Sequence, residues 1–160
     1  MFISTKGRYA LRIMLELALR NTEDYIPLRE LTKSQGISIK YLEAIISILV
    51  KANYVEGLRG KGGGYKLSKS PEEYTVGSIL RLTEGSLAPV SCLECDVNTC
   101  ERADKCPTLP MWQKLQEFID SYFDSITLKD LLEDRNLSHK DFVCDDLFSN
   151  KRVTIKKDDR

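Results

Sequence analysis

Residues 29–67 read RELTKSQGISIKYLEAIISILVKANYVEGLRGKGGGYKL and combine two helical patterns with a glycine-rich hairpin. The first helical pattern ends at Gly36, and Ser38 is a favourable N-cap for a second helix that runs to about residue 52. Apolar residues of this second helix follow i, i+3, i+4, i+7 spacing: Leu42, Ile45, Ile46 and Leu49. Its opposite face is polar: Lys40, Glu43, Ser47 and Lys51. Two helices joined at a glycine-containing turn, the second with a polar outer face, indicate a helix-turn-helix.

A basic hairpin is expected directly after the second helix. Residues 54–58 and 65–67 are the expected strands, and Arg59-Gly60-Lys61-Gly62-Gly63-Gly64 lies between them. Glycines permit positive backbone angles and close approach to another surface, while Arg59 and Lys61 supply cations. A phosphate-binding nucleotide loop is rejected because no Gly-Lys-Ser/Thr ending is present and a strand follows instead of a helix. The segment therefore predicts the wing of a winged helix, with an incidental loop as the alternative.

Charge is divided unevenly along the chain. The 160 residues hold 24 basic and 24 acidic side chains, so the formal net charge is zero. Residues 1–70 hold 12 basic and 6 acidic residues, and residues 71–160 hold 12 basic and 18 acidic. Such asymmetry favours a basic half that binds nucleic acid, although chance asymmetry on solvated faces would look the same.

Composition favours a cytoplasmic protein. With 42% apolar and 30% charged residues, a normal hydrophobic core is available and wholesale disorder is excluded. No apolar run approaches the roughly 20 residues that cross a bilayer, so no membrane partner is expected. Basic residues near the N-terminus are not followed by a cleavage site, so no signal peptide is expected.

Further helices flank the helix-turn-helix. Residues 8–21 are apolar on most of their circumference and predict a nearly enclosed core helix, in which Arg12, Glu16 and Arg20 form the one polar strip. Shorter helices are expected at residues 75–84 and, capped by Thr127, to residue 132. A long helix over residues 109–123 carries an apolar seam for another helix: Trp112, Leu115, Ile119 and Tyr122, broadened by Met111, Phe118 and Phe123. The expected fold is mainly α with a small β-hairpin wing.

Four of the five cysteines lie within 15 residues: Cys92, Cys95, Cys100 and Cys106. In a cytosolic chain, clustered thiols indicate metal or redox chemistry more than structural disulfides. Iron–sulfur clusters are held chiefly by cysteine, and four thiolates also suit tetrahedral zinc. A thiol-based redox switch is the third reading. The fifth cysteine, Cys144, and the single histidine, His139, are expected to be bystanders in the polar C-terminal segment.

Four motifs occur in a characteristic order: Ser4-Thr5-Lys6-Gly7-Arg8-Tyr9-Ala10, Gly36-Ile37-Ser38, Tyr41-Leu42-Glu43 and Arg59-Gly60-Lys61-Gly62-Gly63-Gly64-Tyr65. These motifs resemble those of the Rrf-two family of bacterial winged-helix transcriptional regulators, and the resemblance covers residues 1 to about 135. It implies a homodimer held by the long helix, bound to double-stranded DNA with a pseudo-palindromic operator. It also implies a DNA-binding domain over residues 1–85, a cluster-binding loop over 86–107 and a dimerisation region over 108–136. The polar composition of residues 137–160 predicts a mobile tail.

The resemblance also implies which residues contact DNA. Lys40 and Glu43 match positions that meet base edges in the major groove, and Arg59 matches the arginine that enters the minor groove. Iron–sulfur members usually have a serine where Lys40 stands, so a different sequence preference is expected; for Glu43, an ordinary solvated position is the alternative. Phosphates attract cationic side chains, and narrow minor grooves attract arginine. The full expected set is Thr5, Lys6, Arg8, Ser38, Lys40, Tyr41, Glu43, Arg59 and Lys61.

The cysteines resemble the ligands of the family's iron–sulfur subgroup. Cys92, Cys100 and Cys106 match three ligands, with a first gap two residues longer than usual. A 2Fe-2S cluster is favoured and a 4Fe-4S cluster is the alternative. Leu109 occupies the place of a usual histidine ligand and Arg8 the neighbourhood of an acidic one. Cys95 is therefore the candidate fourth ligand, with a spare thiol as the alternative. Thr108 is the expected N-cap of the long helix, whose positive end favours a thiolate at its start.

The sequence thus predicts a homodimeric transcriptional regulator, not an enzyme. Its operator affinity is expected to respond to an iron–sulfur cluster that senses iron–sulfur status, redox state or nitric oxide. The second reading keeps the winged helix but gives the cysteine loop structural zinc or thiol-redox chemistry. A redox enzyme or iron–sulfur carrier ranks last, because no constellation of acid–base groups accompanies the cysteines.

Overall fold

The computed structural model describes residues 3–20, 24–95, 98 and 100–133. Its helices and strands are α1 (Thr5–Arg20), α2 (Leu28–Gln35), α3 (Ile39–Lys51), β1 (Val55–Leu58), β2 (Gly64–Leu67), α4 (Val76–Glu84), α5 (Leu109–Asp124) and α6 (Leu128–Glu133). Three short 3₁₀ segments join them: η1 (Pro71–Glu73), η2 (Ser91–Leu93) and η3 (Ala103–Lys105). The expected fold class, mainly helical with one antiparallel hairpin, is confirmed. The tail that was predicted over residues 137–160, with His139 and Cys144, lies outside the described residues.

Local signals set the turn between α2 and α3. Gly36 adopts φ +64° and its N–H donates to the Thr32 carbonyl at 2.9 Å, which ends α2 in the left-handed conformation that glycine tolerates. Two residues later, the Ser38 hydroxyl accepts from the Tyr41 N–H at 3.2 Å and begins α3. The predicted cap is therefore confirmed, and it fixes where the polar face of α3 begins.

α1 is the centre of the hydrophobic core. Ile13, Met14 and Leu17 of α1 are at most 3% exposed and belong to one cluster with apolar residues of α2 and α3. The α3 members of that cluster are those whose spacing predicted burial: Leu42, Ile45, Ile46 and Leu49. Burial of each such side chain stabilises the folded state by roughly 1.5–3 kcal/mol relative to leaving the side chain exposed. Packing on α1 thus leaves the other face of α3 in solvent.

The surface of α1 differs from expectation in two ways. The helix begins at Thr5, one turn before the predicted start, because Ser4 and Glu84 accept hydrogen bonds from its first turn. The polar strip also divides: Arg20 pairs with Glu16 at 2.8 Å and with Glu30 at 2.5 Å, whereas Arg12 lies over the Tyr9 ring. The pair of Arg20 with Glu16 follows the predicted i,i+4 spacing, whereas the pair with Glu30 joins α1 to α2 and is not reported by helical periodicity.

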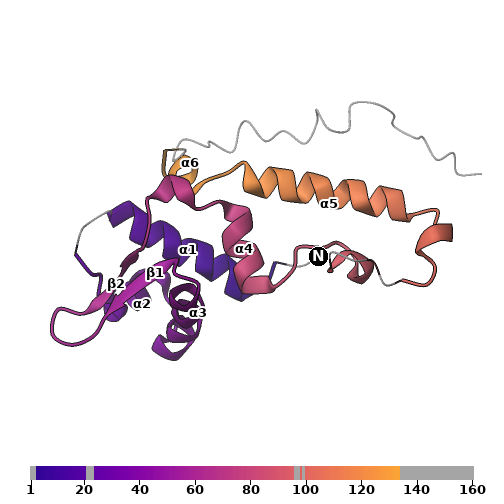
Figure 1. The fold of residues 1–160 in the computed structure, drawn as a ribbon. Coiled ribbons are helices and arrows are strands. Elements are labelled where there is room, and N and C mark those ends of the chain that lie inside the picture. Colours follow the sequence, from indigo (N-terminus) through magenta and orange to yellow (C-terminus); the bar gives the residue numbers. More distant parts are fainter. Residues whose placement is uncertain (1–2, 21–23, 96–97, 99, 134–160) are drawn as a thin grey trace, which may run out of the picture.

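α5 runs beside α4 and extends past the winged-helix body (Figure 1). Ile119 and Phe123 pack against a second apolar cluster on α4, and Trp112 is half-buried. The remaining apolar residues of the predicted seam face solvent at 40–64% exposure: Met111, Leu115, Phe118 and Tyr122. The predicted seam is thus divided between two faces. Arg81 of α4 pairs with Asp120 at 2.8 Å and with Asp124, which holds α5 against α4. Within the described ranges, no helix is long and apolar enough to span a membrane.

Candidate nucleic-acid interface and cysteine loop

The polar face of α3 is exposed along its whole length. Lys40, Glu43 and Ser47 are exposed, and Lys51 closes the row one turn later. Two of the residues expected to contact DNA also stabilise the fold. Ser38 caps α3, and the rings of Tyr41 and Tyr9 pack edge-to-face with their centroids 6.0 Å apart. Because Tyr9 lies on α1, this ring pair brings the first turns of α1 next to the first turn of α3.

The wing is a short hairpin with a firmly held base. β1 and β2 pair from Val55↔Leu67 to Leu58↔Gly64, and Tyr65 exchanges two 2.9 Å backbone hydrogen bonds with Ile26, which precedes α2. An added Cβ at Gly64 would lie 2.3 Å from the Ile26 carbonyl oxygen, so only glycine permits this approach. The base of the wing is thereby tied to the helix-turn-helix.

The tip of the wing presents two cations. Gly60 and Gly62 adopt φ +98° and +81°, and the Gly63 N–H donates to the Gly60 carbonyl at 3.0 Å to close a tight turn. Arg59 and Lys61 are both exposed on this turn. The glycines therefore shape a narrow, positively charged tip.

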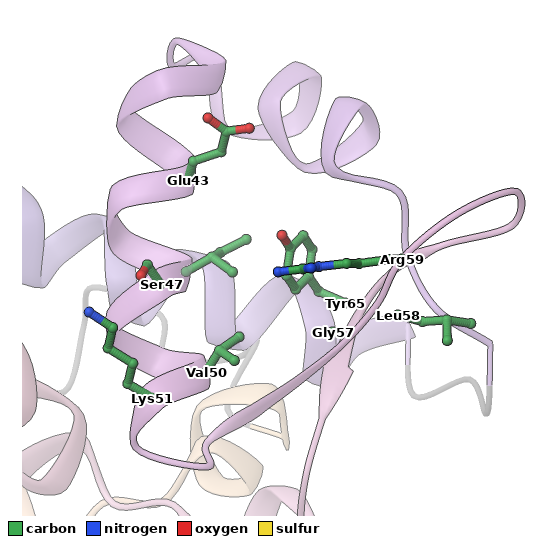
Figure 2. Close-up of a pocket in the computed structure, with 9 residues that line it drawn as sticks. Glu43, Ser47, Val50, Lys51, Gly57, Leu58, Arg59 and Tyr65 are labelled. Carbon is green, nitrogen blue, oxygen red and sulfur yellow. The ribbon is translucent and has the colours of Figure 1, made fainter.

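A groove of about 410 Å³ separates α3 from the wing. Figure 2 shows Glu43, Ser47 and Lys51 in a row on α3, with Arg59 reaching from the wing across Tyr65 toward that row. Ser47, Lys51 and Tyr65 were absent from the predicted DNA-contacting set. The i, i+4 continuation of the polar face from Glu43 pointed to the first two, whereas the place of Tyr65 depends on how the wing folds back.

The start of α1 forms the third part of this surface. Thr5 and Arg8 are exposed and Lys6 is half-buried, and the Arg8 guanidinium lies 3.5 Å from the Thr5 hydroxyl. The ring pair of Tyr9 and Tyr41 joins this segment to α3, and residues of α3 and the wing line the same groove. The structure therefore brings the predicted DNA-contacting residues from three elements into one neighbourhood.

The four loop cysteines are free thiols: Cys92 and Cys106 are half-buried, while Cys95 and Cys100 are exposed. Among the described residues, no three His, Cys, Asp or Glu side chains are grouped as a metal site. The donor set fits iron or zinc by its chemistry, since four unpaired thiols lie on one loop. The loop conformation does not gather these thiols.

Cys106 differs from the other three in its hydrogen bonding. Its Sγ lies 3.4 Å from the Thr108 hydroxyl, and this side-chain hydrogen bond, aided by backbone N–H groups of Thr108 and Leu109, lowers the pKa of the Cys106 thiol. Thr108 occupies the predicted N-cap position of α5, but its side chain makes no capping hydrogen bond. The hydroxyl instead favours a thiolate at Cys106, the form that binds metals.

Comparisons with known proteins agree on one family. Residues 3–134 match the Rrf2 family model, described as an iron-dependent transcriptional regulator. The chain is 36% identical over 137 residues to the HTH-type transcriptional regulator IscR of Aliivibrio salmonicida, covering 86% of this chain and 80% of that protein.

Solved structures give the same result. The chain resembles CymR, the global cysteine regulator of B. subtilis, with a TM-score of 0.68 and 35% identity over 83% of this chain and 97% of that one. It also resembles T. potens IscR, with a TM-score of 0.64 and 34% identity over 84% of this chain and 88% of that one. The family-model match over residues 3–134 includes both the winged helix and the cysteine loop.

Proposed function

The chain belongs to the Rrf2 family of DNA-binding transcriptional regulators, and on this premise we propose that it is a homodimer whose operator affinity is modulated by an iron–sulfur cluster. Its relatives are transcriptional regulators and not enzymes. The observation that carries the DNA-binding part is the groove where Arg59 of the wing faces the polar row of α3.

The two sides of this groove read different features of the duplex. α3 enters the major groove, where Lys40 and Glu43 meet base edges; one good bidentate base contact contributes about 1–3 kcal/mol of discrimination. Arg59 enters the minor groove, whose negative potential attracts guanidinium groups. Lys6, Arg8 and Lys61 contact phosphates, and Ser47 and Lys51 extend the contact surface along α3.

The exposed stripe on α5 forms the homodimer. Met111, Leu115, Phe118 and Tyr122 follow a 4, 3, 4 spacing that places them on one side of the helix, and each is at least 40% exposed. Such spacing matches a helix–helix seam, and exposed apolar stripes of this kind mark protein–protein contacts. A two-fold dimer would read a pseudo-palindrome with half-sites about 34–36 Å apart.

The cysteine loop holds the cluster, with Cys92, Cys100 and Cys106 as ligands and Cys95 as the candidate fourth. Four unpaired thiols, the lowered pKa of the Cys106 thiol and the similarity to IscR proteins support this assignment. A bound cluster would supply a centre that responds to iron supply, oxidants or nitric oxide. The loop connects Gly85 at the end of α4 to Leu109 at the start of α5, so its conformation bears on both helices.

The lowered pKa of Cys106 also supports a second candidate, in which the loop thiols themselves respond to oxidants. The thiolate is the reactive form, and Cys106 is half-buried within reach of solvent. The two candidates share the winged helix and differ only in what the loop carries.

Anaerobic purification followed by iron, zinc and sulfide analysis and an absorption spectrum tests the cluster. We expect a brown protein with stoichiometric iron and sulfide, and a colourless Cys100→Ser variant. Cys144→Ser, which changes a cysteine outside the loop, is the matched control and should stay brown. Zinc without sulfide would support the structural alternative, and a metal-free protein with intact DNA binding would support the thiol switch.

DNA titration tests the response. A duplex of about 30 base pairs, long enough for two half-sites one turn apart, is selected by the wild-type protein from a randomised pool. Coupling of the usual size changes operator affinity about 5–150-fold between the cluster-loaded and metal-free forms. Equal affinities at fixed salt would refute the sensing role and leave DNA binding intact.

A further inference from the structure

Glu84, the last residue of α4, holds the first turn of α1 through one carboxylate oxygen. Its Oε1 accepts hydrogen bonds from the Ser4 hydroxyl at 2.7 Å, the Ser4 N–H at 3.2 Å and the Gly7 N–H at 3.1 Å. The first N–H groups of a helix lack partners within the helix, and the positive end of the helix dipole favours an anion there. A residue 80 positions away in the sequence therefore caps α1.

Gly7 is shaped for this contact. A Cβ at Gly7 would lie 2.2 Å from Glu84 Oε1 and 3.3 Å from the Leu80 side chain, so any larger residue would displace the carboxylate. Gly7 is buried, and it sits between Lys6 and Arg8, the two cations expected to meet phosphates. The glycine in the Ser4–Ala10 motif thus has a packing reason that its position in the sequence does not reveal.

The carboxylate also determines how DNA can approach this segment. A free helix N-terminus is a ready site for a phosphate, but here Glu84 fills that place. Phosphates must then be met by the side chains of Lys6 and Arg8, whose directions depend on the orientation of the first turn. That orientation is shared with α3 through the Tyr9–Tyr41 ring pair.

Glu84 also stands at the entrance of the cysteine loop. Gly85 follows it with φ +85° and its N–H donates to the Arg81 carbonyl at 2.9 Å, so the loop leaves the helix immediately after the capping residue. On the same turn, Arg81 pairs with Asp120 and Asp124 of α5. Arg81 and Glu84, which carry opposite charges three residues apart on α4, thus contact α5 and α1 respectively.

We propose that Glu84 is the positioning residue that couples the cysteine loop to the DNA-contacting start of α1. This inference rests on the proposed function and names the route by which the loop acts. A change in residues 86–107 alters the end of α4, moves the carboxylate relative to Ser4 and Gly7, and reorients Lys6 and Arg8. Removing the carboxylate therefore weakens phosphate contacts and uncouples DNA affinity from the state of the loop.

The test compares Glu84→Gln and Glu84→Ala in the full-length protein with the control Glu73→Gln. Glu73 also accepts hydrogen bonds from a serine N–H and hydroxyl, but these belong to Ser70, three residues before it. Affinity for the selected duplex is measured at several salt concentrations. The Glu84 variants should bind about tenfold more weakly, and the steepness of their salt dependence should fall by about one to two phosphate contacts. Glu73→Gln should match the wild type.

A double-mutant cycle separates positioning from simple stabilisation. In a Lys6→Ala/Arg8→Ala background, Glu84→Gln should cause no further loss of affinity, because the side chains it orients are gone. The ratio of the DNA affinity of the cluster-loaded protein to that of the metal-free protein should approach one in Glu84→Gln and stay at the wild-type value in Glu73→Gln. If Glu84→Ala does not fold, Glu84→Gln, which keeps the size of the side chain, supplies the comparison.

Two results would overturn the inference alone: an unchanged salt dependence in the Glu84 variants, or a loaded-to-free ratio equal to that of the wild type. A lower melting temperature with unchanged DNA affinity would also overturn it, since it would reduce Glu84 to a stabilising cap. A wild-type protein that selects no duplex, or binds it equally in both states, would instead refute the proposed function.

Discussion

Phe118→Ala tests the α5 stripe most directly, because Phe118 is the most exposed of the large apolar side chains in the described part of the chain, at 64%. A fully accessible phenylalanine presents roughly 200 Å², so about 130 Å² per subunit is available for burial between two copies of α5. At about 25 cal/mol per Å², this burial contributes about 3 kcal/mol per subunit. Alanine retains part of this area, which leaves a loss of about 2.5 kcal/mol per subunit, or about 5 kcal/mol per symmetric dimer.

A loss of that size raises the dimer dissociation constant by roughly three orders of magnitude or more. Sedimentation velocity over a wide range of protein concentrations measures the constant directly. The subunit itself should stay folded, because Phe118 projects from the α5 face opposite the contacts with α4. DNA affinity should fall in parallel, since two half-sites are then no longer bound as a unit.

Leu19→Ala is the matched control, because Leu19 is a large apolar side chain, 47% exposed, that lies on α1 and not on α5. It should leave the dimer dissociation constant unchanged. The reasoning is refuted if Phe118→Ala also leaves the constant unchanged, or if the wild-type protein is monomeric at all concentrations. An unchanged constant would require another surface to hold the two recognition helices, and a monomeric wild type would refute the homodimer itself.

Three further perturbations follow from the interface and the loop. Arg59→Ala should cost about 1–3 kcal/mol of binding free energy for the selected duplex and reduce discrimination against a scrambled duplex. Lys61→Ala should weaken binding to the two duplexes equally and lower the slope of log affinity against log salt concentration by about one. Parallel titrations of the two duplexes separate these effects. Gly64→Ala, whose Cβ would lie 2.3 Å from a backbone oxygen, should destabilise the protein by about 1–3 kcal/mol in urea unfolding, and an unchanged midpoint would contradict the described packing. Thr108→Val removes the hydrogen bond that lowers the pKa of the Cys106 thiol, so the thiolate fraction at neutral pH should fall and the alkylation profile of metal-free protein should shift to higher pH; a profile that stays in place would show that Thr108 does not set this pKa.

The sequence predicted best those features that depend on neighbours along the chain. Gly36 and Ser38 marked the turn of the helix-turn-helix, and the spacing of apolar residues in α3 identified its buried face. The glycine-rich segment likewise predicted the hairpin. In each case the physical cause, a cap, a left-handed residue or a periodic stripe, lies within a few residues of its effect.

Features that depend on distant contacts were missed or misread. The hydrogen bonds from Ser4 to Glu84 join residues 80 positions apart, and no periodicity reports them. The apolar residues of α5 looked like one seam because spacing alone does not tell which of them α4 covers. Tertiary packing decides such choices.

The backbone hydrogen bonds between Ile26 and Tyr65 anchor the base of the wing and leave its tip open to substitution. Because the base of the wing is hydrogen-bonded to the segment before α2, substitutions or length changes between Leu58 and Gly64 should alter the contacts of the tip without moving α3. Under the proposed function, minor-groove preference can therefore change during evolution while major-groove reading stays the same. Related regulators with exchanged tips should keep their half-site core and differ in the flanking base pairs that they favour.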